Sequence, residues 1–230
     1  MYTMTTENYD GYTHVHNLQE KALKEDTTEE ELKEVYAAWS KTYDKDMCIN
    51  LSYNGPAVAA EQFTQTLKEF GYTNDTRILD LGCGTGLVGE ELKKRGYKNI
   101  DGVDLMPEML EVAKAKCIYG LLQQGSMGSP ECKDLGIGAN QYDVAICVGV
   151  FTLAHVKSEG FDDLVHVVKP GGLASFAIRE LALNAPQYGY REKMDQLCKE
   201  GKWKFVAKHH EAAYLSDDTA GAWFFVYQIL

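Results

Sequence analysis

The fold is decided by residues 77–86, which read Arg77-Ile78-Leu79-Asp80-Leu81-Gly82-Cys83-Gly84-Thr85-Gly86. The apolar run 78–81 is typical of a buried parallel strand. The alternate glycines that follow allow a sharp turn and let a ligand approach the backbone closely. We expect residues 87–94 to form a helix whose first N–H groups face that ligand. The stretch therefore predicts a nucleotide site made of a strand, a glycine-rich turn and a helix.

The composition of the chain is that of an ordinary globular protein. Its 230 residues are 45% hydrophobic and 25% charged, which is enough for one sizeable core. The formal net charge of −11, with only a short basic cluster at 93–95, predicts no nucleic-acid partner. The six cysteines form no CxxC motif and have no zinc-ligand spacing to a histidine, which indicates reduced thiols and no metal site.

The sequence also bears on location and on domain organisation. No apolar run is long enough for a membrane span, and the N-terminus has no signal-peptide pattern, so we expect a cytoplasmic protein without membrane association, the nucleus being a second location. Residues 1–26 are polar and predict a mobile arm. Residues 27–230 predict a single domain, divided into an N-terminal helical lid (27–72), a cofactor-binding core (73–180) and a C-terminal helix and hairpin (181–230).

The lid is predicted to contain helices over 27–41 and 56–70. Thr27 and Glu30 have the spacing of a capping box, and an apolar stripe follows them. Trp39 and Tyr43 lie four residues apart where the first helix should end. They are interpreted either as core packing or as residues that close over a bound ligand.

Strand and helix patterns then alternate along the chain. Strands are predicted at 78–81, 99–103, 117–124, 142–150 and 173–178, with an antiparallel pair at 203–209 and 222–229. This alternation indicates an α/β fold with a largely parallel sheet and helices on both faces. Ligands of such sheets lie at the C-terminal ends of the strands, so Asp80, Asp104, Ser126 and residues 148–155 should converge on one crevice.

Two cofactor classes compete for this crevice. The first is a dinucleotide, because Gly84, Gly86 and Gly89 fit the GxGxxG pattern and Asp104 follows at about the distance of a ribose-binding acid. Against it, residues 82–83 separate the pattern from the strand, and the carboxylate of Asp80 would repel a pyrophosphate.

The second class is S-adenosylmethionine, which carries an ammonium and a sulfonium but no phosphate, and which the acids therefore favour. The glycine turn would contact its methionine part, and Asp104 would accept hydrogen bonds from both ribose hydroxyls. Leu105 and Met106 would flank the adenine, with Ser126 and Met127 at its edge. The candidate cofactor contacts are Trp39, Tyr43, Asp80, Gly82, Cys83, Gly84, Gly86, Asp104, Leu105, Met106, Ser126, Met127 and Val148.

Three segments in order, 79–86, 102–110 and 167–172, resemble the successive motifs of class I S-adenosylmethionine-dependent methyltransferases. Residues 39–46 and the region around Trp203 extend this resemblance. It implies a three-layer Rossmann-like methyltransferase sandwich, with a seven-stranded, mostly parallel sheet whose last strand is antiparallel. It also implies S-adenosyl-L-methionine as cofactor and S-adenosyl-L-homocysteine as product. Many members carry an acid after the third strand that bonds the adenine amine, and here Ser126 stands near that place.

The expected reaction is an in-line displacement, for which the protein mainly aligns the reactants and excludes water. His155 is the best candidate for a catalytic base; the alternative is a histidine at a helix start in the cleft wall. Arg179 could hold an acidic acceptor or form a surface ion pair. The apolar residues 148–153 replace the Asn/Asp-Pro-Pro-Tyr run found in enzymes that methylate nucleic-acid bases. We therefore expect a small-molecule acceptor; the alternatives are a protein methyltransferase, a non-catalytic cofactor-binding module and a nicotinamide-dependent oxidoreductase.

Overall fold

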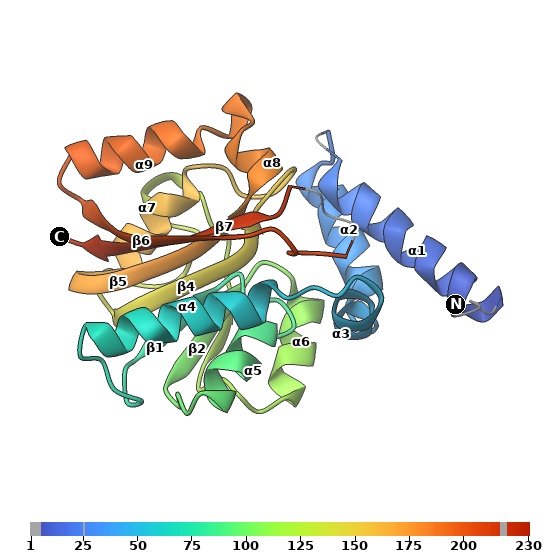
Figure 1. Ribbon diagram of the computed structural model, residues 1–230, viewed down its shortest axis with the longest axis horizontal. Helices are drawn as coiled ribbons and strands as arrows, with labels where there is room; N and C mark the ends of the chain where they lie inside the picture. Colours follow the sequence, from blue (N-terminus) through green and yellow to red (C-terminus); the bar gives the residue numbers. More distant parts are fainter. Residues whose placement is uncertain (1–5, 25, 217–219) are drawn as a thin grey trace.

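The computed structural model describes residues 6–24, 26–216 and 220–230, with residues 6–13 described by their backbone alone. A seven-stranded sheet with the order β3-β2-β1-β4-β5-β7-β6 forms its centre (Figure 1). The strands are β1 Ile78–Leu81, β2 Ile100–Asp104, β3 Leu122–Gln124, β4 Tyr142–Phe151, β5 Val168–Arg179, β6 Trp203–Glu211 and β7 Ala222–Ile229. Strands β1 to β5 pair in parallel, and β7 lies antiparallel between β5 and β6. The predicted fold class, with its antiparallel last strand, is confirmed.

Helices cover both faces of the sheet. Figure 1 shows α4, α5 and α6 on one face and α7 and α9 on the other. Helices α1, α2 and α3 lie beyond one end of the sheet (Figure 1). The helical segments are α1 Thr6–Leu23, α2 Glu29–Trp39, α3 Tyr43–Lys45, η1 Asp46–Asn50, α4 Gly55–Glu69, α5 Leu87–Lys94, α6 Pro107–Ala115, η2 Pro130–Cys132, α7 Gly160–Val167, α8 Glu180–Leu183, η3 Pro186–Tyr188 and α9 Tyr190–Lys199.

Strand β1 is buried on both sides because β2 and β4 flank it and helices cover both of its faces. Its side chains alternate between two cores, as a strand requires. Leu79 and Leu81 pack in the core on the α7 side, whereas Ile78 packs with α4 and α5. Asp80 shares the face of Ile78, so the pleat directs this carboxyl toward α5 and away from the α7 side.

The N-terminal region differs from the mobile arm that the sequence predicted. Residues 6–23 form helix α1, and Val15 and Ala22 are both 1% exposed. Val15, Leu18 and Ala22 recur at helical spacing and pack against the lid helices and α6. Because most of this segment is polar, the sparse apolar stripe was not recognised in the sequence. The remaining domain boundaries stay a prediction.

The capping box at the start of α2 lies one residue later than predicted. The Thr28 Oγ1 accepts a hydrogen bond from the Glu31 N–H at 3.2 Å, and the Thr28 N–H donates to Glu31 Oε2 at 2.8 Å. The Thr27 hydroxyl instead donates to the Lys21 carbonyl at 2.7 Å. Thr27 therefore connects α1 to α2, and Thr28 has the capping role.

The third strand is shorter than the predicted run 117–124. Pairing with β2 begins at Leu122, opposite Gly102. Cys117 has a positive φ of 51°, which interrupts an extended chain. Residues 168–172, which precede the predicted strand 173–178, belong to β5, whose pairing with β4 shifts register there.

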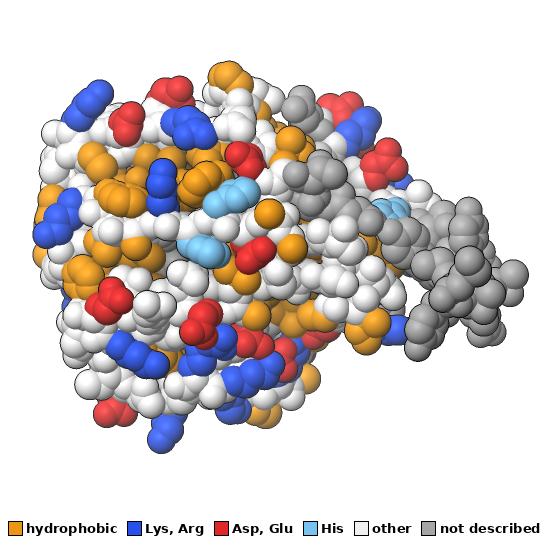
Figure 2. Space-filling view, in the orientation of Figure 1, with side chains coloured by type: hydrophobic (Ala, Val, Ile, Leu, Met, Phe, Trp, Pro, Cys, Tyr) orange, Lys and Arg blue, Asp and Glu red, His pale blue; other side chains and the backbone are white. Residues whose placement is uncertain are grey.

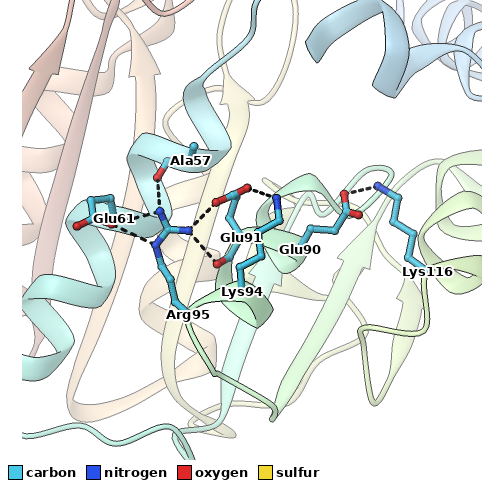
Figure 3. A network of polar contacts seen from close by, with 7 residues as sticks. All are labelled: Ala57, Glu61, Glu90, Glu91, Lys94, Arg95 and Lys116. Carbon is cyan, nitrogen blue, oxygen red and sulfur yellow. Dashed lines mark hydrogen bonds and ion pairs between the residues drawn. The ribbon is translucent and has the colours of Figure 1, made fainter. Parts of the chain in front are cut away.

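Charged side chains on α5 connect it to its neighbours. Arg95 lies between Glu61 of α4 and Glu91 of α5, with nitrogen–oxygen distances of 3.2 and 2.6 Å (Figure 3). Lys116, after α6, contacts Glu90 at 2.8 Å (Figure 3). On the face shown in Figure 2, acidic and basic side chains are interspersed. These contacts fix the helix that begins at the glycine turn.

Within the described ranges, no helix combines the length and the apolar character that crossing a bilayer requires. The same residues contain no cluster of three or more His, Cys, Asp or Glu side chains that could hold a metal ion.

The aromatic core under α7 provides a test of the packing. Phe161 is fully buried, with its ring centroid 4.7 Å from that of Phe151 and 4.8 Å from that of Phe176. We predict that Phe161→Ala lowers the free energy of unfolding by about 3–5 kcal/mol, because it leaves a cavity in this cluster. Phe205→Ala, at a side chain 49% exposed on β6, should cost less than about 1 kcal/mol. Urea unfolding measures both, and equal losses would contradict this packing.

Candidate cofactor and acceptor site

A cavity of about 490 Å³ opens at the C-terminal ends of the central strands. This volume lies in the usual range for small-molecule sites. The turn after β1, the ends of β2 and β4 and the loop after β3 form its floor, and α2 and α3 contribute Leu32, Tyr36 and Tyr43 to its wall. Segments far apart in the sequence thus meet at one place.

The structure brings most of the predicted site residues to this cavity and leaves three out. Trp39, Asp80 and Gly86 do not line it. Those that do are Tyr43, Gly82, Cys83, Gly84, Asp104, Leu105, Met106, Ser126, Met127, Val148 and His155.

Asp104, the last residue of β2, connects two segments of the cavity wall. Its Oδ2 accepts the Gly84 N–H at 2.7 Å, and its Oδ1 accepts the Met106 N–H at 2.8 Å. Desolvation inside the site raises the pKa of this carboxyl, and the backbone N–H groups oppose that rise. Each oxygen still has a lone pair for a second donor. The carboxylate can therefore receive two adjacent hydroxyl groups, as a ribose presents.

The glycine turn leaves open space where a ligand would lie. Gly84 has a φ of +52°, and a Cβ added there would meet no protein atom within 4 Å. A Cβ added at Gly86 would lie 3.1 Å from the ring of Tyr119. Gly86 is thus needed for packing against Tyr119, which explains why it does not line the cavity. Helix α5 begins directly after it, with no side-chain cap on its first N–H groups.

Asp80 lies behind the turn, and the expectation of a direct cofactor contact is corrected. The carboxyl is fully buried, and the Tyr119 hydroxyl donates to its Oδ2 at 2.7 Å. Its Oδ1 has no hydrogen-bond partner among the described residues. Burial raises the pKa of Asp80 to about 7, with a further rise from the charge of Asp104 and an opposing effect from the Tyr119 hydrogen bond. The pleat of β1, which directs this side chain toward α5, is the physical reason.

Only one of the two predicted lid aromatics faces the cavity. Trp39 is 2% exposed, and its Nε1 donates to Asp46 Oδ2 at 3.0 Å. Its ring supports that of Tyr43 edge-on, with centroids 4.9 Å apart. Trp39 is therefore core, and Tyr43 is the residue that contributes to the cavity wall.

Asp44 connects this lid segment to the glycine turn, a role that the sequence did not reveal. It accepts a short hydrogen bond from the Thr85 hydroxyl and an ion pair from Lys116 Nζ at 2.6 Å. Lys116 also contacts Glu90 of α5. These contacts hold together three segments at the cavity mouth: the lid at Asp44, the glycine turn with α5, and the residues after α6.

His155 is engaged on both ring nitrogens. Its Nδ1 lies 2.7 Å from the Leu153 carbonyl oxygen, and its Nε2 lies 2.8 Å from the Tyr36 hydroxyl. Desolvation lowers the pKa of the imidazole, so the ring is neutral near pH 7. Tyr36 lies in the apolar stripe of the helix predicted over 27–41, and no sequence signal pairs it with a residue 119 positions away.

The loop that carries Ser126 and Met127 is positioned by a buried acid that sequence reasoning missed. Asp163 of α7 is fully buried, and its Oδ2 accepts the Gly128 N–H at 2.6 Å. Burial raises the pKa of Asp163. Arg179, the other candidate acceptor contact, lines a smaller hollow of about 50 Å³ beside the main cavity.

The comparisons with known proteins agree with this geometry. A family profile described as a methyltransferase domain matches residues 78–172. Methyltransferase-like protein 27 from Homo sapiens is 33% identical over 193 residues, which cover 82% of this chain and 73% of the relative. The ubiquinone/menaquinone biosynthesis C-methyltransferase UbiE from Geotalea daltonii is 30% identical over 110 residues, 46% of each chain.

Solved structures show the same fold. The S-adenosylmethionine-dependent methyltransferase from Clostridium acetobutylicum superposes with a TM-score of 0.60 at 16% identity, covering 84% of this chain and 98% of that one. From its motifs, sheet order and relatives, the chain belongs to the class I S-adenosylmethionine-dependent methyltransferases.

Asp80 makes a pH-dependent contribution to stability that can be measured. Its pKa is raised from 3.8 to about 7 in the folded state, so the folded protein holds a proton that the unfolded chain releases. This stabilisation is present below pH 3.8 and is lost as the pH rises through about 7. We predict that the stability difference between wild type and Asp80→Asn falls by about 2 kcal/mol from about pH 5 to about pH 7. Urea unfolding at the two pH values measures it, and parallel changes in both proteins would contradict the assignment.

Proposed function

We propose that this protein transfers a methyl group from S-adenosyl-L-methionine to a small-molecule acceptor and releases S-adenosyl-L-homocysteine. The observation that carries the proposal is the Asp104 carboxylate, which holds the glycine turn and the β2–α6 turn with one lone pair left on each oxygen. That arrangement suits the paired hydroxyls of a ribose.

The rest of the cavity supports the same cofactor. Gly84 offers open space to the methionine part, Leu105 and Met106 offer apolar surface to the adenine, and Ser126 lies at its edge. When bound, this cofactor supplies a methyl group on a positively charged sulfur that leaves readily. The protein's task is then to orient the acceptor and to exclude water.

The charge around the turn favours a cation over a dinucleotide. The charge of the Asp104 carboxylate reaches the turn, since it helps to raise the pKa of Asp80. A sulfonium and an ammonium gain from this field, whereas a pyrophosphate in the same place would be repelled.

The acceptor side of the cavity carries apolar side chains. Val148 and Val150 of β4 line it together with Tyr43 and Tyr53. This wall suits a small organic molecule, and together with the net charge of −11 it disfavours nucleic acid. We place the activity in the cytoplasm, with the nucleus as a second location and no membrane partner. A protein acceptor or a non-catalytic cofactor-binding module are the alternatives.

A finer relationship belongs to the same proposal. Residues 39–46 and the region around Trp203 most resemble the methyltransferase-like protein of the Williams–Beuren syndrome chromosome region. The 33% identity to methyltransferase-like protein 27 supports membership of a methyltransferase-like subgroup.

Calorimetry with S-adenosylhomocysteine tests the cofactor site. We predict that Asp104→Asn weakens binding by at least about 30-fold. The asparagine NH2 group replaces one carboxylate oxygen and cannot accept the backbone N–H and the ribose hydroxyl that this oxygen would accept. Asp101→Asn is the matched control on the same strand, where Asp101 contacts Arg77 and Tyr142 at the other end. It should bind as the wild type does. Unchanged binding by Asp104→Asn would reject this site.

Incubation with methyl-labelled S-adenosylmethionine and a metabolite extract separates the enzyme from the binding module. A labelled small-molecule product supports the enzyme. Binding of S-adenosylhomocysteine without product from any fraction favours the module.

A further inference from the structure

The protonation of His155 follows from its two hydrogen bonds. The Leu153 carbonyl oxygen at 2.7 Å from Nδ1 can only accept, so Nδ1 carries the proton of the neutral ring. Nε2 then presents a lone pair, and the Tyr36 hydroxyl at 2.8 Å must donate to it. The basic nitrogen of the site is therefore covered by Tyr36.

The Tyr36 oxygen is the atom through which this base can reach a ligand. Tyr36 lines the cavity alongside Asp104 and the turn residues, and its ring stands edge-on to that of His155 with centroids 5.7 Å apart. The Tyr36 hydroxyl donates its proton to the hydrogen bond with Nε2, and the lone pairs of its oxygen remain available as acceptors. Desolvation raises the pKa of Tyr36, so it does not ionise alone and must pass its proton on as it receives another.

From this geometry we infer that Tyr36 is the catalytic residue that takes the acceptor's proton, that His155 is the positioning and final proton-holding residue behind it, and that the acceptor atom is a hydroxyl oxygen. The inference rests on the proposed methyl transfer and deepens it, since it names the acceptor class.

The step balances in atoms and charge. The acceptor oxygen forms a bond to the methyl carbon, and the carbon–sulfur bond breaks with its electron pair going to sulfur. The acceptor's proton moves to the Tyr36 oxygen, while the Tyr36 proton moves to His155 Nε2. The products are a methyl ether, a thioether and an imidazolium whose Nδ1–H still donates to Leu153. One positive charge is lost on sulfur as one is gained on His155, so the total charge of the site does not change.

A hydroxyl is the acceptor that needs this relay. Carboxylates are already ionised near neutral pH, and thiols ionise readily, so neither requires a base behind a tyrosine. An amine attacks as its neutral free base, whose lone pair is available without removal of a proton, so it does not require the relay either. The apolar surface of Val148, Val150 and Tyr53 suits a small aromatic molecule that bears the hydroxyl.

The experiment compares four matched probes: 4-ethylphenol, 4-ethylbenzoate, 4-ethylthiophenol and 4-ethylaniline. Methyl transfer from labelled S-adenosylmethionine is measured for the wild type, for Tyr36→Phe and for Tyr142→Phe. Tyr142 is the control, because its buried side chain also donates a hydrogen bond, to Asp101 Oδ2 at 3.0 Å, but lies at the start of β4, away from the C-terminal strand ends where the cavity opens. S-adenosylhomocysteine binding is measured for each protein by calorimetry.

We expect product from 4-ethylphenol, with kcat lowered by at least about 100-fold in Tyr36→Phe and unchanged in Tyr142→Phe. S-adenosylhomocysteine binding should be the same in all three proteins, which a merely structural role in closing the lid would not allow. ¹⁵N spectra of the full chain with S-adenosylhomocysteine bound should show His155 protonated at Nδ1 and bare at Nε2, with the Nε2 shift moved in Tyr36→Phe.

Several results would overturn the inference while leaving the cofactor site intact. They are cofactor binding without product from 4-ethylphenol, undiminished kcat in Tyr36→Phe, product from the thiol, carboxylate or amine probe alone, or a protonated Nε2 in the spectra. If the wild type does not bind S-adenosylhomocysteine, the proposed function itself is rejected.

Discussion

The site depends on one carboxylate that holds two turns of the chain at a fixed separation. Asp104 ends β2 and accepts N–H groups from Gly84, after β1, and from Met106, at the start of α6. The backbone reinforces this junction, since the Gly82 and Cys83 N–H groups both donate to the Val103 carbonyl at 2.8 and 3.0 Å. Neighbouring parallel strands thus place a glycine turn and an acid side by side, and the acid becomes rigid before any ligand arrives. Preorganisation of this kind lowers the ordering cost of binding.

The N-terminal helices complete the cavity through two separate polar connections to the core. Asp44 contacts Thr85 and Lys116 at the glycine turn, and Tyr36 contacts His155 beyond β4. Trp39 supports this arrangement from behind through its bond to Asp46. The lid is therefore bound to both sides of the cavity it covers. Because the second connection joins a tyrosine hydroxyl to a histidine nitrogen, it can also carry a proton.

Local patterns in the sequence were sufficient for the sheet, but contacts between distant segments were not accessible to them. The strand periods and the glycine turn placed β1, β2, β4 and α5 closely, because these signals are local. The helix α1 was missed because its apolar stripe, around Val15 and Ala22, is sparse in a polar segment. Asp80 was assigned to the cavity because sequence shows its position at the strand end but not the face to which the pleat turns it. The pairing of Tyr36 with His155 depends on how α2 docks on the sheet, which no local signal encodes.

The most direct test of the central claim is a crystal structure of the protein with S-adenosylhomocysteine bound. We predict that both ribose hydroxyls lie within about 2.5–3.0 Å of the Asp104 carboxylate oxygens, one on each. The Gly84 and Met106 N–H bonds to the same carboxylate should be retained. A ribose held by other residues, or a ligand bound outside this cavity, would contradict the account.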